Sequence, residues 1–361
     1  MSLNNYISLG RSGIRVSPLC LGAMTFGKDW GWGSDVEESK QILDRYIDLG
    51  GNFIDTANGY TKGHSEAIIG DHIGRHSSRR DRLVIATKFL TNMYRGDPNG
   101  GGAGRKSLIS ACENSLRRLQ TDYIDLYWMH FWDRFTPIEE TMRALDDLVA
   151  AGKVRYIGFS DTPAWKVAQA QTTAVLKGWT PLIALQLEYS LLERTIEGEL
   201  IPAALELGLG VTPWSPLRSG MLTGKYTRES VKTANPGRGA FVTRAFTETA
   251  FSVLDVLTTV AREAQTTVAR AALAWVVQRP GVASTIIGAR TMEQLEDNLG
   301  ALDVKLSADQ IKTLDEASRP ALNFPHDFLE RVKTFGYNGA TIDGQVSPVN
   351  PASPANDSER Y

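Results

Sequence analysis

Short apolar runs recur along the chain and alternate with longer stretches in which apolar residues fall at helical spacing. Each run spans four or five residues, and several are apolar at consecutive positions, as in strands buried on both faces. The predicted strands are Leu19–Gly22, Asn52–Asp55, Leu83–Thr87, Asp125–Met129, Val154–Gly158, Ile183–Leu187, Gly210–Trp214 and Ser284–Ile287.

Helices are predicted between these strands. Two of them are followed by glycine, at Gly50-Gly51 and at Gly152, where a left-handed residue commonly ends a helix. The predicted helices are Glu37–Leu49, Arg105–Leu119, Ile138–Ala151, Pro163–Leu176, Glu199–Leu207, Glu248–Ala264, Val268–Gln278 and Met292–Leu299.

Strands that alternate with helices predict a parallel sheet, and eight is the number of strands that closes a (β/α)₈ barrel, also called a TIM barrel. The alternative is an open, doubly wound sheet, which would carry a glycine-rich turn after its first strand. Here the first strand continues into LGAMTFG, without a GxGxxG sequence. The pattern therefore favours the closed barrel.

The two ends of the chain differ from this repeating pattern. Residues Tyr6–Val16 predict a hairpin that turns at Ser12-Gly13 and covers the bottom of the barrel. Residues 1–337 are predicted to form a single domain, and residues 338–361 a polar tail. Within the domain, Asn323–Tyr337 has apolar residues at helical spacing, and we hypothesise that it folds over the barrel mouth as a lid. The stretches Asn92–Gly104 and Arg218–Ala240 are glycine-rich and predict loops, the first of them flexible.

Charge and composition narrow the function classes. The 361 residues include 39 Lys and Arg and 41 Asp and Glu, so the net charge of −2 offers no general attraction to nucleic acid or to an anionic membrane. The two cysteines, Cys20 and Cys112, form no zinc-binding pattern and fit a reducing compartment. Without a signal sequence or a long apolar run, we expect a cytoplasmic protein.

Four residues with acid–base chemistry lie at or just after three successive predicted strands. Asp55 ends the second strand, Tyr60 follows it by five residues, Lys88 ends the third strand, and His130 ends the fourth. Taken singly, each has an ordinary structural explanation as a helix cap, a packed ring, a solvated strand end or a core histidine. In a barrel, however, the carboxyl ends of all strands meet at one face, where active sites form. The combination therefore predicts a shared site.

These four side chains suit proton transfer to a carbonyl group. A free phenol, with a pKa of about 10, is a weak acid at neutral pH, and a neighbouring ammonium lowers that pKa. We expect Lys88 to act on Tyr60 in this way, and Asp55 to hold Lys88 in place and keep it charged. His130 would donate a hydrogen bond to the carbonyl oxygen, and Tyr60 would donate the proton.

A metal site is not predicted. His64, His72 and His76 are spaced by eight and four residues, but Arg75, Arg79 and Arg80 lie nearby in the sequence. This composition favours a solvated helix face over a cluster of metal ligands.

At this point the chain resembles the aldo-keto reductase family. The segments NFIDTANGY, ATKF and WMH resemble the family's catalytic tetrad in order and in strand position. Later segments, GKVRYIGFSD, LQLEYSLL, TPWSPLRSGMLTGKY and IIGARTMEQLEDN, resemble its cofactor-binding strands five to eight. The resemblance extends from about Tyr6 to Leu306 and implies hydride transfer between a nicotinamide cofactor and a carbonyl or alcohol.

The resemblance also implies a role for each matching residue. Asp55, Tyr60, Lys88 and His130 would be catalytic. Ser160 and Gln186 would bind the nicotinamide carboxamide, Trp214 would stack on its ring, and Ser215 and Leu217 would meet the pyrophosphate. The adenosine phosphate would contact Gly288, Arg290, Gln294 and Asn298. Met24 and Asp55 are further expected cofactor contacts.

Two positions depart from the family pattern. Ser160-Asp161 stands where many members have Ser-Asn, and an ionised Asp161 cannot donate a hydrogen bond to an amide. Gly288 and Gln294 stand where basic residues are common, which leaves Arg290 as the main candidate for a 2′-phosphate. A guanidinium binds phosphate in a bidentate manner, so NADPH is expected rather than NADH.

The substrate is predicted only as a small-molecule carbonyl or alcohol, and no oligomeric state is predicted. Several aromatic residues could line an apolar pocket or pack on the barrel rim: Trp30, Trp32, Tyr94, Phe131, Trp132, Phe335 and Tyr337. A redox-sensing regulatory subunit is the alternative function. A barrel hydrolase with paired carboxylates is a third, for which only Asp55 and Glu188 are suitably placed.

Overall fold

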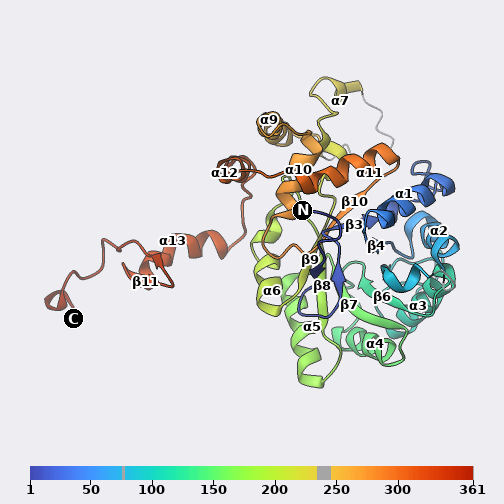
Figure 1. Ribbon diagram of the computed structural model, residues 1–361. Helices are drawn as coiled ribbons and strands as arrows, with labels where there is room; N and C mark the ends of the chain where they lie inside the picture. Colours follow the sequence, from blue (N-terminus) through green and yellow to red (C-terminus); the bar gives the residue numbers. More distant parts are fainter. Residues whose placement is uncertain (75–77, 234–244, 361) are drawn as a thin grey trace. The chain divides into compact units, whose positions relative to one another are not determined.

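The computed structural model describes residues 1–74, 78–233 and 245–360. This part of the chain contains one sheet of eight parallel strands in the order β10-β3-β4-β5-β6-β7-β8-β9 (Figure 1). Its strands are β3 (Leu19–Gly22), β4 (Phe53–Asp55), β5 (Val84–Phe89), β6 (Ile124–Met129), β7 (Val154–Ser160), β8 (Leu182–Glu188), β9 (Gly210–Trp214) and β10 (Thr285–Gly288). Every predicted strand is confirmed, with its bounds shifted by two residues at most.

The sheet closes into a barrel between its first and last strands. The backbone N–H of Val211 in β9 donates to the Gly281 carbonyl over 2.9 Å, and the N–H of Ala283 donates back to the Val211 carbonyl over 2.9 Å. These two bonds join β9 to the segment that leads into β10. The predicted (β/α)₈ barrel is therefore confirmed, and the open doubly wound alternative is wrong.

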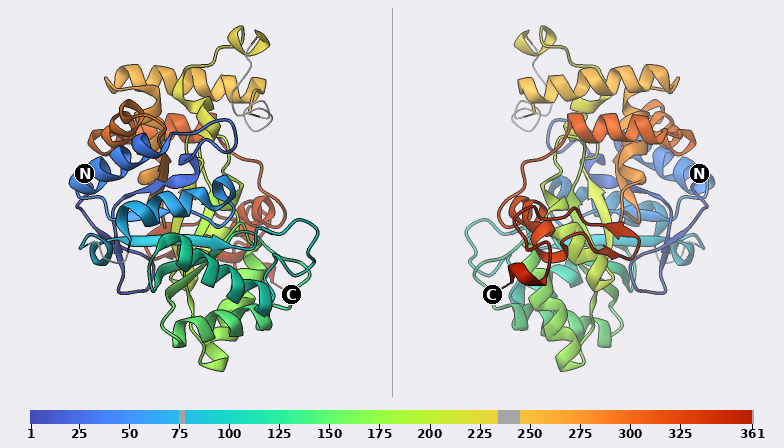
Figure 2. Two further views of the ribbon diagram at one scale, coloured as in Figure 1. Left: turned by 90° about the vertical axis from the view of Figure 1, so that its right-hand side faces the viewer. Right: turned by 90° about the vertical axis from the view of Figure 1, so that its left-hand side faces the viewer.

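Helices surround the sheet and follow its strands in sequence (Figure 2). The main helices of the barrel unit are α1 (Val36–Asp48), α2 (His64–Ile73), α3 (Arg105–Leu119), α4 (Ile138–Ala150), α5 (Ala164–Lys177), α6 (Leu200–Leu207), α9 (Glu248–Glu263), α10 (Val268–Val277), α11 (Met292–Leu299) and α12 (Ala308–Ala317). The eight predicted helices are confirmed to within one residue at each end. Short 3₁₀ turns lie at η1 (Ala23–Thr25), η2 (Tyr60–Gly63), η3 (Arg80–Arg82), η4 (Thr195–Glu197), η5 (Arg218–Thr223) and η6 (Gly300–Asp303), and a single helical turn forms α7 (Ser230–Thr233).

Two separate apolar clusters lie on the two faces of the strands. The larger cluster lies between strands and helices, and includes Leu21, Ile54 and Ile85. The smaller one fills the inside of the barrel, and includes Phe53 and Val84. Successive residues of a strand thus enter different clusters, because side chains alternate across a strand.

An N-terminal hairpin closes the bottom of the barrel, as predicted. Strands β1 (Ile7–Ser8) and β2 (Arg15–Val16) pair in antiparallel fashion, and Leu9 and Val16 belong to the inner cluster. The predicted turn position is wrong by one residue, since the observed pairing centres the turn on Arg11-Ser12. Gly10 is the residue with positive φ, at 60°, because its backbone lies directly against β8 and β9.

The histidine-containing segment is only partly a solvated face. His64 pairs with Asp29 over 2.7 Å and His72 pairs with Asp44 over 2.8 Å, while the other face of α2 is buried. His76 and Arg75 lie outside the described residues. Among those described, no group of three His, Cys, Asp or Glu side chains has the arrangement of a metal site.

Arg80 corrects the prediction of a solvated face, because its side chain is buried. Its guanidinium donates to the carbonyls of Leu83 (3.1 Å) and Tyr123 (2.7 Å) and pairs with Asp125 over 2.8 Å. These partners replace the water that a buried charge loses. Arg80 therefore joins the segments that lead into β5 and β6.

Contacts divide the chain into two compact units, Met1–Arg319 and Pro320–Tyr361. The second unit contains α13 (His326–Tyr337), a hairpin of β11 (Thr341–Ile342) and β12 (Gln345–Val346), and the turn η7 (Asp357–Glu359). The division falls before α13 rather than after it, so the segment proposed as a lid groups with the C-terminal residues. Its role as a lid stays a prediction.

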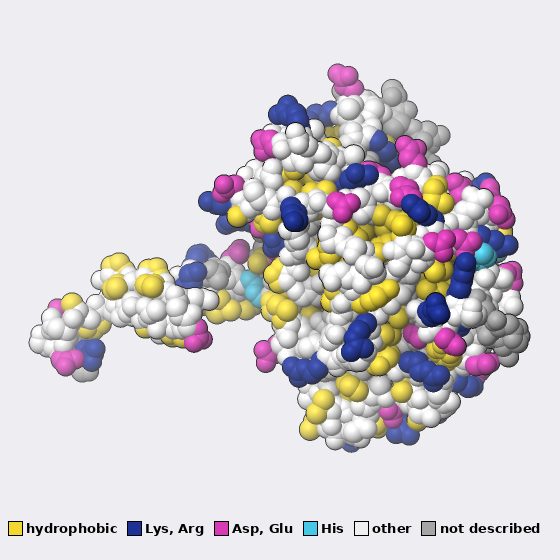
Figure 3. All heavy atoms as spheres, viewed as in Figure 1, with side chains coloured by type: hydrophobic (Ala, Val, Ile, Leu, Met, Phe, Trp, Pro, Cys, Tyr) yellow, Lys and Arg dark blue, Asp and Glu magenta, His cyan; other side chains and the backbone are white. Residues whose placement is uncertain are grey.

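Charges of both signs are interspersed over the barrel unit on the face seen in Figure 3. Among the helices of the described ranges, none combines the length and apolar character needed to cross a bilayer.

Gly10 offers a test of the hairpin plug. A Cβ at this position would lie 2.2 Å from the Ile183 carbonyl oxygen, so Gly10→Ala should lower the free energy of unfolding by about 2–4 kcal/mol. Gly31→Ala is the matched control, because Gly31 also has positive φ but its Cβ would meet nothing within 4 Å. We expect a loss of about 1 kcal/mol for the control. Equal losses in urea unfolding would show that backbone strain alone, and not the fit of the plug, explains the effect.

Candidate active site

The predicted catalytic residues share the inner face of the barrel for a local reason. In β5, Val84 and Ala86 enter the inner cluster, and Lys88 is the next residue of the same parity. In β6, Leu126 and Trp128 enter it, and His130 follows two residues later. Alternation along each strand therefore directs these side chains inward at the carboxyl end. Asp55 follows Phe53 by the same rule.

A buried ion pair forms the centre of the site. Lys88 pairs with Asp55, and the two side chains are 0% and 3% exposed. The Lys88 ammonium also donates to the Thr56 carbonyl over 2.9 Å and to the Tyr60 hydroxyl over 3.2 Å. Gln186 donates to the second Asp55 oxygen over 3.0 Å. Both charges thus have the hydrogen-bond partners that a buried pair requires.

Electrostatics around the phenol differ from the prediction. Burial raises the pKa of Tyr60 above its ordinary value, and the opposing effect of the Lys88 ammonium is smaller. For Lys88, burial acts to lower the pKa of the ammonium, but the contacts with Asp55 and Tyr60 outweigh this effect, and the pKa is raised. Tyr60 therefore keeps its proton at neutral pH and Lys88 keeps its charge. The predicted direction of the Lys88 effect is right, but the predicted net fall in the Tyr60 pKa is wrong.

His130 lies edge-on to Tyr60, with ring centroids 5.7 Å apart. Burial, together with the Lys88 charge, lowers the pKa of His130 to about 3, so the imidazole is neutral at physiological pH. Its Nδ1 is buried and has no hydrogen-bond partner among the described residues. Because an unpaired buried acceptor is tolerated better than an unpaired N–H, we assign the single proton to Nε2.

The residues expected to hold the carboxamide lie side by side. Ser160 ends β7 and is paired in register with Gln186 in β8, and both are buried. The Ser160 hydroxyl donates to Asp161 over 3.2 Å. Gln186 uses one amide hydrogen on Asp55 and leaves its carbonyl oxygen and second hydrogen for a ligand.

Asp161 is a site residue whose contact the sequence analysis missed. Its carboxylate accepts a hydrogen bond from the Trp214 indole N–H over 3.0 Å. The departure from Ser-Asn to Ser-Asp was the available signal. Trp214 ends β9 and packs against the inner cluster, which leaves its ring partly exposed at the barrel mouth.

The segment after β9 supplies the next predicted contacts. Ser215 adopts a positive φ of 54°, and its hydroxyl accepts the backbone N–H of Ser219 over 3.2 Å. Leu217 directly precedes η5, and its carbonyl accepts the N–H of Gly220 over 2.9 Å. Arg218 forms an ion pair with Glu188. The Glu188 carboxylate is one of the two that the hydrolase alternative would need, and this ion pair engages it.

The predicted adenosine-phosphate residues gather where β10 leads into α11. Asn298 donates to the Gly288 carbonyl over 3.1 Å, and the Gln294 side chain accepts the Arg290 backbone N–H over 2.9 Å. The guanidinium of Arg290 has no recorded partner within residues 1–74, 78–233 and 245–360. Met24, in η1 after β3, is 38% exposed. An unpaired cation beside a helix start suits a phosphate.

Aromatic rings line the approach to Tyr60. The Trp30 ring lies edge-on to Tyr60, with ring centroids 6.3 Å apart. Trp30 also contacts Trp32 in a tilted arrangement, with ring centroids 5.6 Å apart. On the other side, His130 lies 5.7 Å from Phe131. Of the remaining predicted aromatic residues, Trp132 lies against Lys166, and Phe335 and Tyr337 belong to the second unit.

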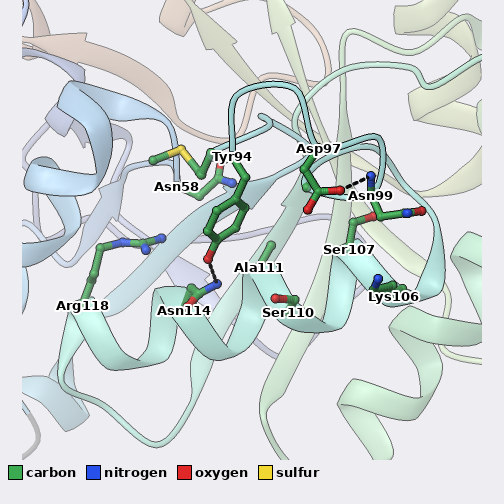
Figure 4. A pocket seen from close by; sticks show the side chains of 12 residues that line it. Asn58, Tyr94, Asp97, Asn99, Lys106, Ser107, Ser110, Ala111, Asn114 and Arg118 are labelled. Carbon is green, nitrogen blue, oxygen red and sulfur yellow. Dashed lines mark hydrogen bonds between the residues drawn. The ribbon is translucent and has the colours of Figure 1, made fainter.

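A separate pocket lies between the loop 92–104 and α3 (Figure 4). Tyr94 accepts a hydrogen bond from Asn114 over 3.4 Å, and Asn99 donates its backbone N–H to Asp97 over 2.8 Å, so the loop is folded onto the helix. The pocket contains no predicted site residue, although Asn58 connects it to the loop that carries Tyr60.

The arrangement of charged and aromatic residues on the inner face agrees with comparisons to known proteins. The model of the Aldo/keto reductase family matches residues 18–319. The chain belongs to the aldo/keto reductase family. It is therefore an NAD(P)-dependent oxidoreductase, and the hydrolase alternative is wrong.

Curated relatives agree with this assignment. An uncharacterized oxidoreductase, YrpG, from Bacillus subtilis is 39% identical over 86% of this chain and 95% of its own length. The aryl-alcohol dehydrogenase GME11368 of Pestalotiopsis microspora is 38% identical over 88% and 82%. An aryl-alcohol dehydrogenase [NADP(+)] of Phanerodontia chrysosporium is 36% identical over 87% and 86%.

The neutrality of His130 can be tested by NMR. Since its pKa is lowered to about 3, its ring resonances should not shift between pH 5 and 8. In the unfolded chain the imidazole takes up a proton below about pH 6.5, so the stability contribution of His130 falls as pH drops from 6.5 towards 3. His130→Gln assigns the resonances by removing them. A titration midpoint above pH 5 would contradict the argument.

Proposed function

We propose that this enzyme reduces aldehydes or ketones to alcohols with NADPH, or catalyses the reverse oxidation, with Tyr60 as the general acid. The observation that carries the proposal is the contact of one buried ammonium, Lys88, with both Asp55 and Tyr60. These contacts hold the Tyr60 phenol beside the fixed positive charge of Lys88 at the mouth of the barrel.

Ser160, Gln186 and Trp214 would hold the nicotinamide, which when bound would supply hydride for the carbonyl carbon. Tyr60 gives its phenolic proton to the carbonyl oxygen, which completes the alcohol and leaves a phenolate. The Lys88 ammonium stabilises that phenolate at 3.2 Å, and Asp55 keeps Lys88 charged. Neutral His130 donates its Nε2–H to the carbonyl oxygen and orients the substrate.

The raised pKa of Tyr60 affects the two directions differently. Reduction needs the protonated phenol, which predominates at neutral pH. Oxidation of an alcohol needs the phenolate as a base, so its rate should rise with pH. The same group thus serves as acid and as base.

The cofactor would lie across the carboxyl ends of β7 to β10. Ser160 and Gln186 offer polar atoms for the carboxamide, Trp214 offers a ring face, and the segment of Ser215 and Leu217 would adjoin the pyrophosphate. Met24 and Asp55 would border the nicotinamide. At the far end, Gly288, Arg290, Gln294 and Asn298 would hold the adenosine phosphate. The unpaired guanidinium and the NADP(+) in the name of one relative support NADPH over NADH.

Aromatic carbonyls and alcohols are the substrate class we propose. Two relatives carry the name aryl-alcohol dehydrogenase. Trp30 lies beside Tyr60 and Phe131 beside His130, and offset or edge-to-face ring contacts stabilise aromatic ligands. The redox-sensing alternative would bind the cofactor without turnover.

Replacing the acid tests the mechanism. Tyr60→Phe removes the proton donor, so kcat for aldehyde reduction should fall by about 10²–10⁴-fold while the Kd for NADPH stays within about twofold. Tyr94→Phe is the matched control, since Tyr94 lies in the neighbouring pocket and should retain activity. If the wild type binds NADPH but turns over no carbonyl or alcohol in a panel of substrates, the sensor function gains support. Full activity of Tyr60→Phe would refute Tyr60 as the acid.

Replacing the phosphate cation tests cofactor choice. Arg290→Leu should raise the KM for NADPH by about tenfold or more, because a charge-assisted contact to the 2′-phosphate is lost, and leave the KM for NADH unchanged. Arg262→Leu, on the exposed side of α9, controls for net charge. A parallel rise in both KM values would mean that Arg290 does not read the 2′-phosphate.

A further inference from the structure

Asp161 is held in an unusual backbone conformation at the barrel mouth. It follows β7 directly with φ of 41°, a left-handed value that costs a residue other than glycine about 1 kcal/mol. Its backbone N–H donates to the Gln186 carbonyl over 3.1 Å. In this conformation its two carboxylate oxygens accept the Ser160 hydroxyl and the Trp214 indole N–H. Asp161 thus contacts two of the residues proposed to hold the nicotinamide.

The charge of Asp161 is not neutralised by an ion pair. Within the described ranges, no Lys, Arg or His side chain lies within ion-pair distance of it. The two other carboxylates on this inner face are paired, Asp55 with Lys88 and Glu188 with Arg218. Asp161 therefore contributes an uncompensated negative charge beside the Trp214 ring.

The protonation of Asp161 responds to its surroundings. Burial raises its pKa to about 6; the hydrogen bonds from Trp214 and Ser160 oppose the rise, nearby Glu188 adds to it, and Lys88 counteracts it. The Asp161 carboxylate is also one of the groups that raise the pKa of Tyr60, whose phenol is uncharged at neutral pH. Asp161 is exposed to water, although protein surrounds its carboxylate closely enough to desolvate it in part. Asp161 is therefore mostly ionised above pH 7 and mostly protonated at pH 5.

We propose that Asp161 determines the preference of the site for the oxidised over the reduced nicotinamide cofactor. The proposal rests on the proposed function, in which Trp214 and Ser160 meet the nicotinamide. The oxidised ring is a cation and the reduced ring is neutral, so a nearby carboxylate stabilises only the oxidised form. The face of the Trp214 indole also attracts a cationic ring, so it too favours the oxidised cofactor.

This preference bears on the direction of the reaction. In the proposed reduction the carbonyl carbon would accept hydride from the reduced cofactor and its oxygen would accept the Tyr60 proton, so the nicotinamide ring would become cationic as the alcohol forms. An ionised Asp161 therefore shifts the equilibrium on the enzyme towards alcohol and oxidised cofactor. Each tenfold preference for the oxidised form makes the bound two-electron couple about 30 mV more reducing.

The experiment measures two dissociation constants by quenching of tryptophan fluorescence, for NADPH and for NADP⁺, at pH 8 and pH 5. In Asp161→Asn at pH 8, the ratio of Kd for NADP⁺ to Kd for NADPH should rise by about fivefold or more. Asparagine keeps an acceptor oxygen for Trp214 and tolerates positive φ. At pH 5 wild type and variant should differ by less than about twofold, because Asp161 is then protonated.

Two control variants separate charge from shape. Glu206→Gln removes one negative charge near the carboxyl end of α6. This end of the helix leads to the amino-terminal side of the strands, opposite the proposed site, so the ratio of the two Kd values should stay unchanged. Trp214→Phe keeps a ring but loses the N–H donor, so both Kd values should rise while Asp161 keeps most of the preference for NADP⁺.

An unchanged ratio in Asp161→Asn at pH 8 would overturn the proposal. Equal weakening of both cofactors would also overturn it, because Asp161 would then act only through the position of Trp214. If wild type binds neither cofactor, the proposed function itself fails. If it binds both and only the ratio test fails, the reductase function stands without this role for Asp161.

Discussion

The strands of this barrel are buried on both faces along most of their length, and the rest of the molecule follows from that constraint. Outward side chains must pack against helices, and inward ones must fill a narrow interior closed at one end by Leu9 and Val16 of the hairpin. The polar inward residues Asp55, Lys88 and Gln186 lie at or near the carboxyl ends of their strands, towards the mouth of the barrel. The proposed chemistry depends on these positions and on the loops that follow them.

The buried Lys88–Asp55 pair shows how such a position is stabilised. Removing two charges from water is costly, and the Coulomb attraction alone does not always offset it. Here the Thr56 carbonyl, the Gln186 amide and the Tyr60 hydroxyl complete the hydrogen bonds of both groups. The same contacts that make the pair tolerable also place the Tyr60 phenol beside a fixed positive charge, so stability and the proposed proton transfer depend on one network.

Charge is distributed unevenly around the mouth. On the side of Tyr60 the charges of Lys88 and Asp55 are paired and the neighbouring His130 imidazole is neutral, which supports the phenol as the proposed proton donor. Within the described residues, the Asp161 carboxylate beside Trp214 has no ion-pair partner, and neither has the Arg290 guanidinium after β10. The unpaired charges lie where the proposed cofactor has charges of opposite sign, at the oxidised ring and at the phosphate.

The sequence by itself determined the positions of the strands and helices and the gathering of Asp55, Lys88 and His130 at the carboxyl face of the barrel, because alternation and helical periodicity are local properties of the chain. It also identified Asp161 as a departure from the family pattern, but not its hydrogen bond with Trp214. Only the tertiary structure decided that Arg80 is buried, that the hairpin turns at Arg11-Ser12, and that Asp161 bonds to Trp214 53 residues away. It also reversed the expected pKa of Tyr60, since desolvation depends on every segment that packs around a group once the barrel has closed.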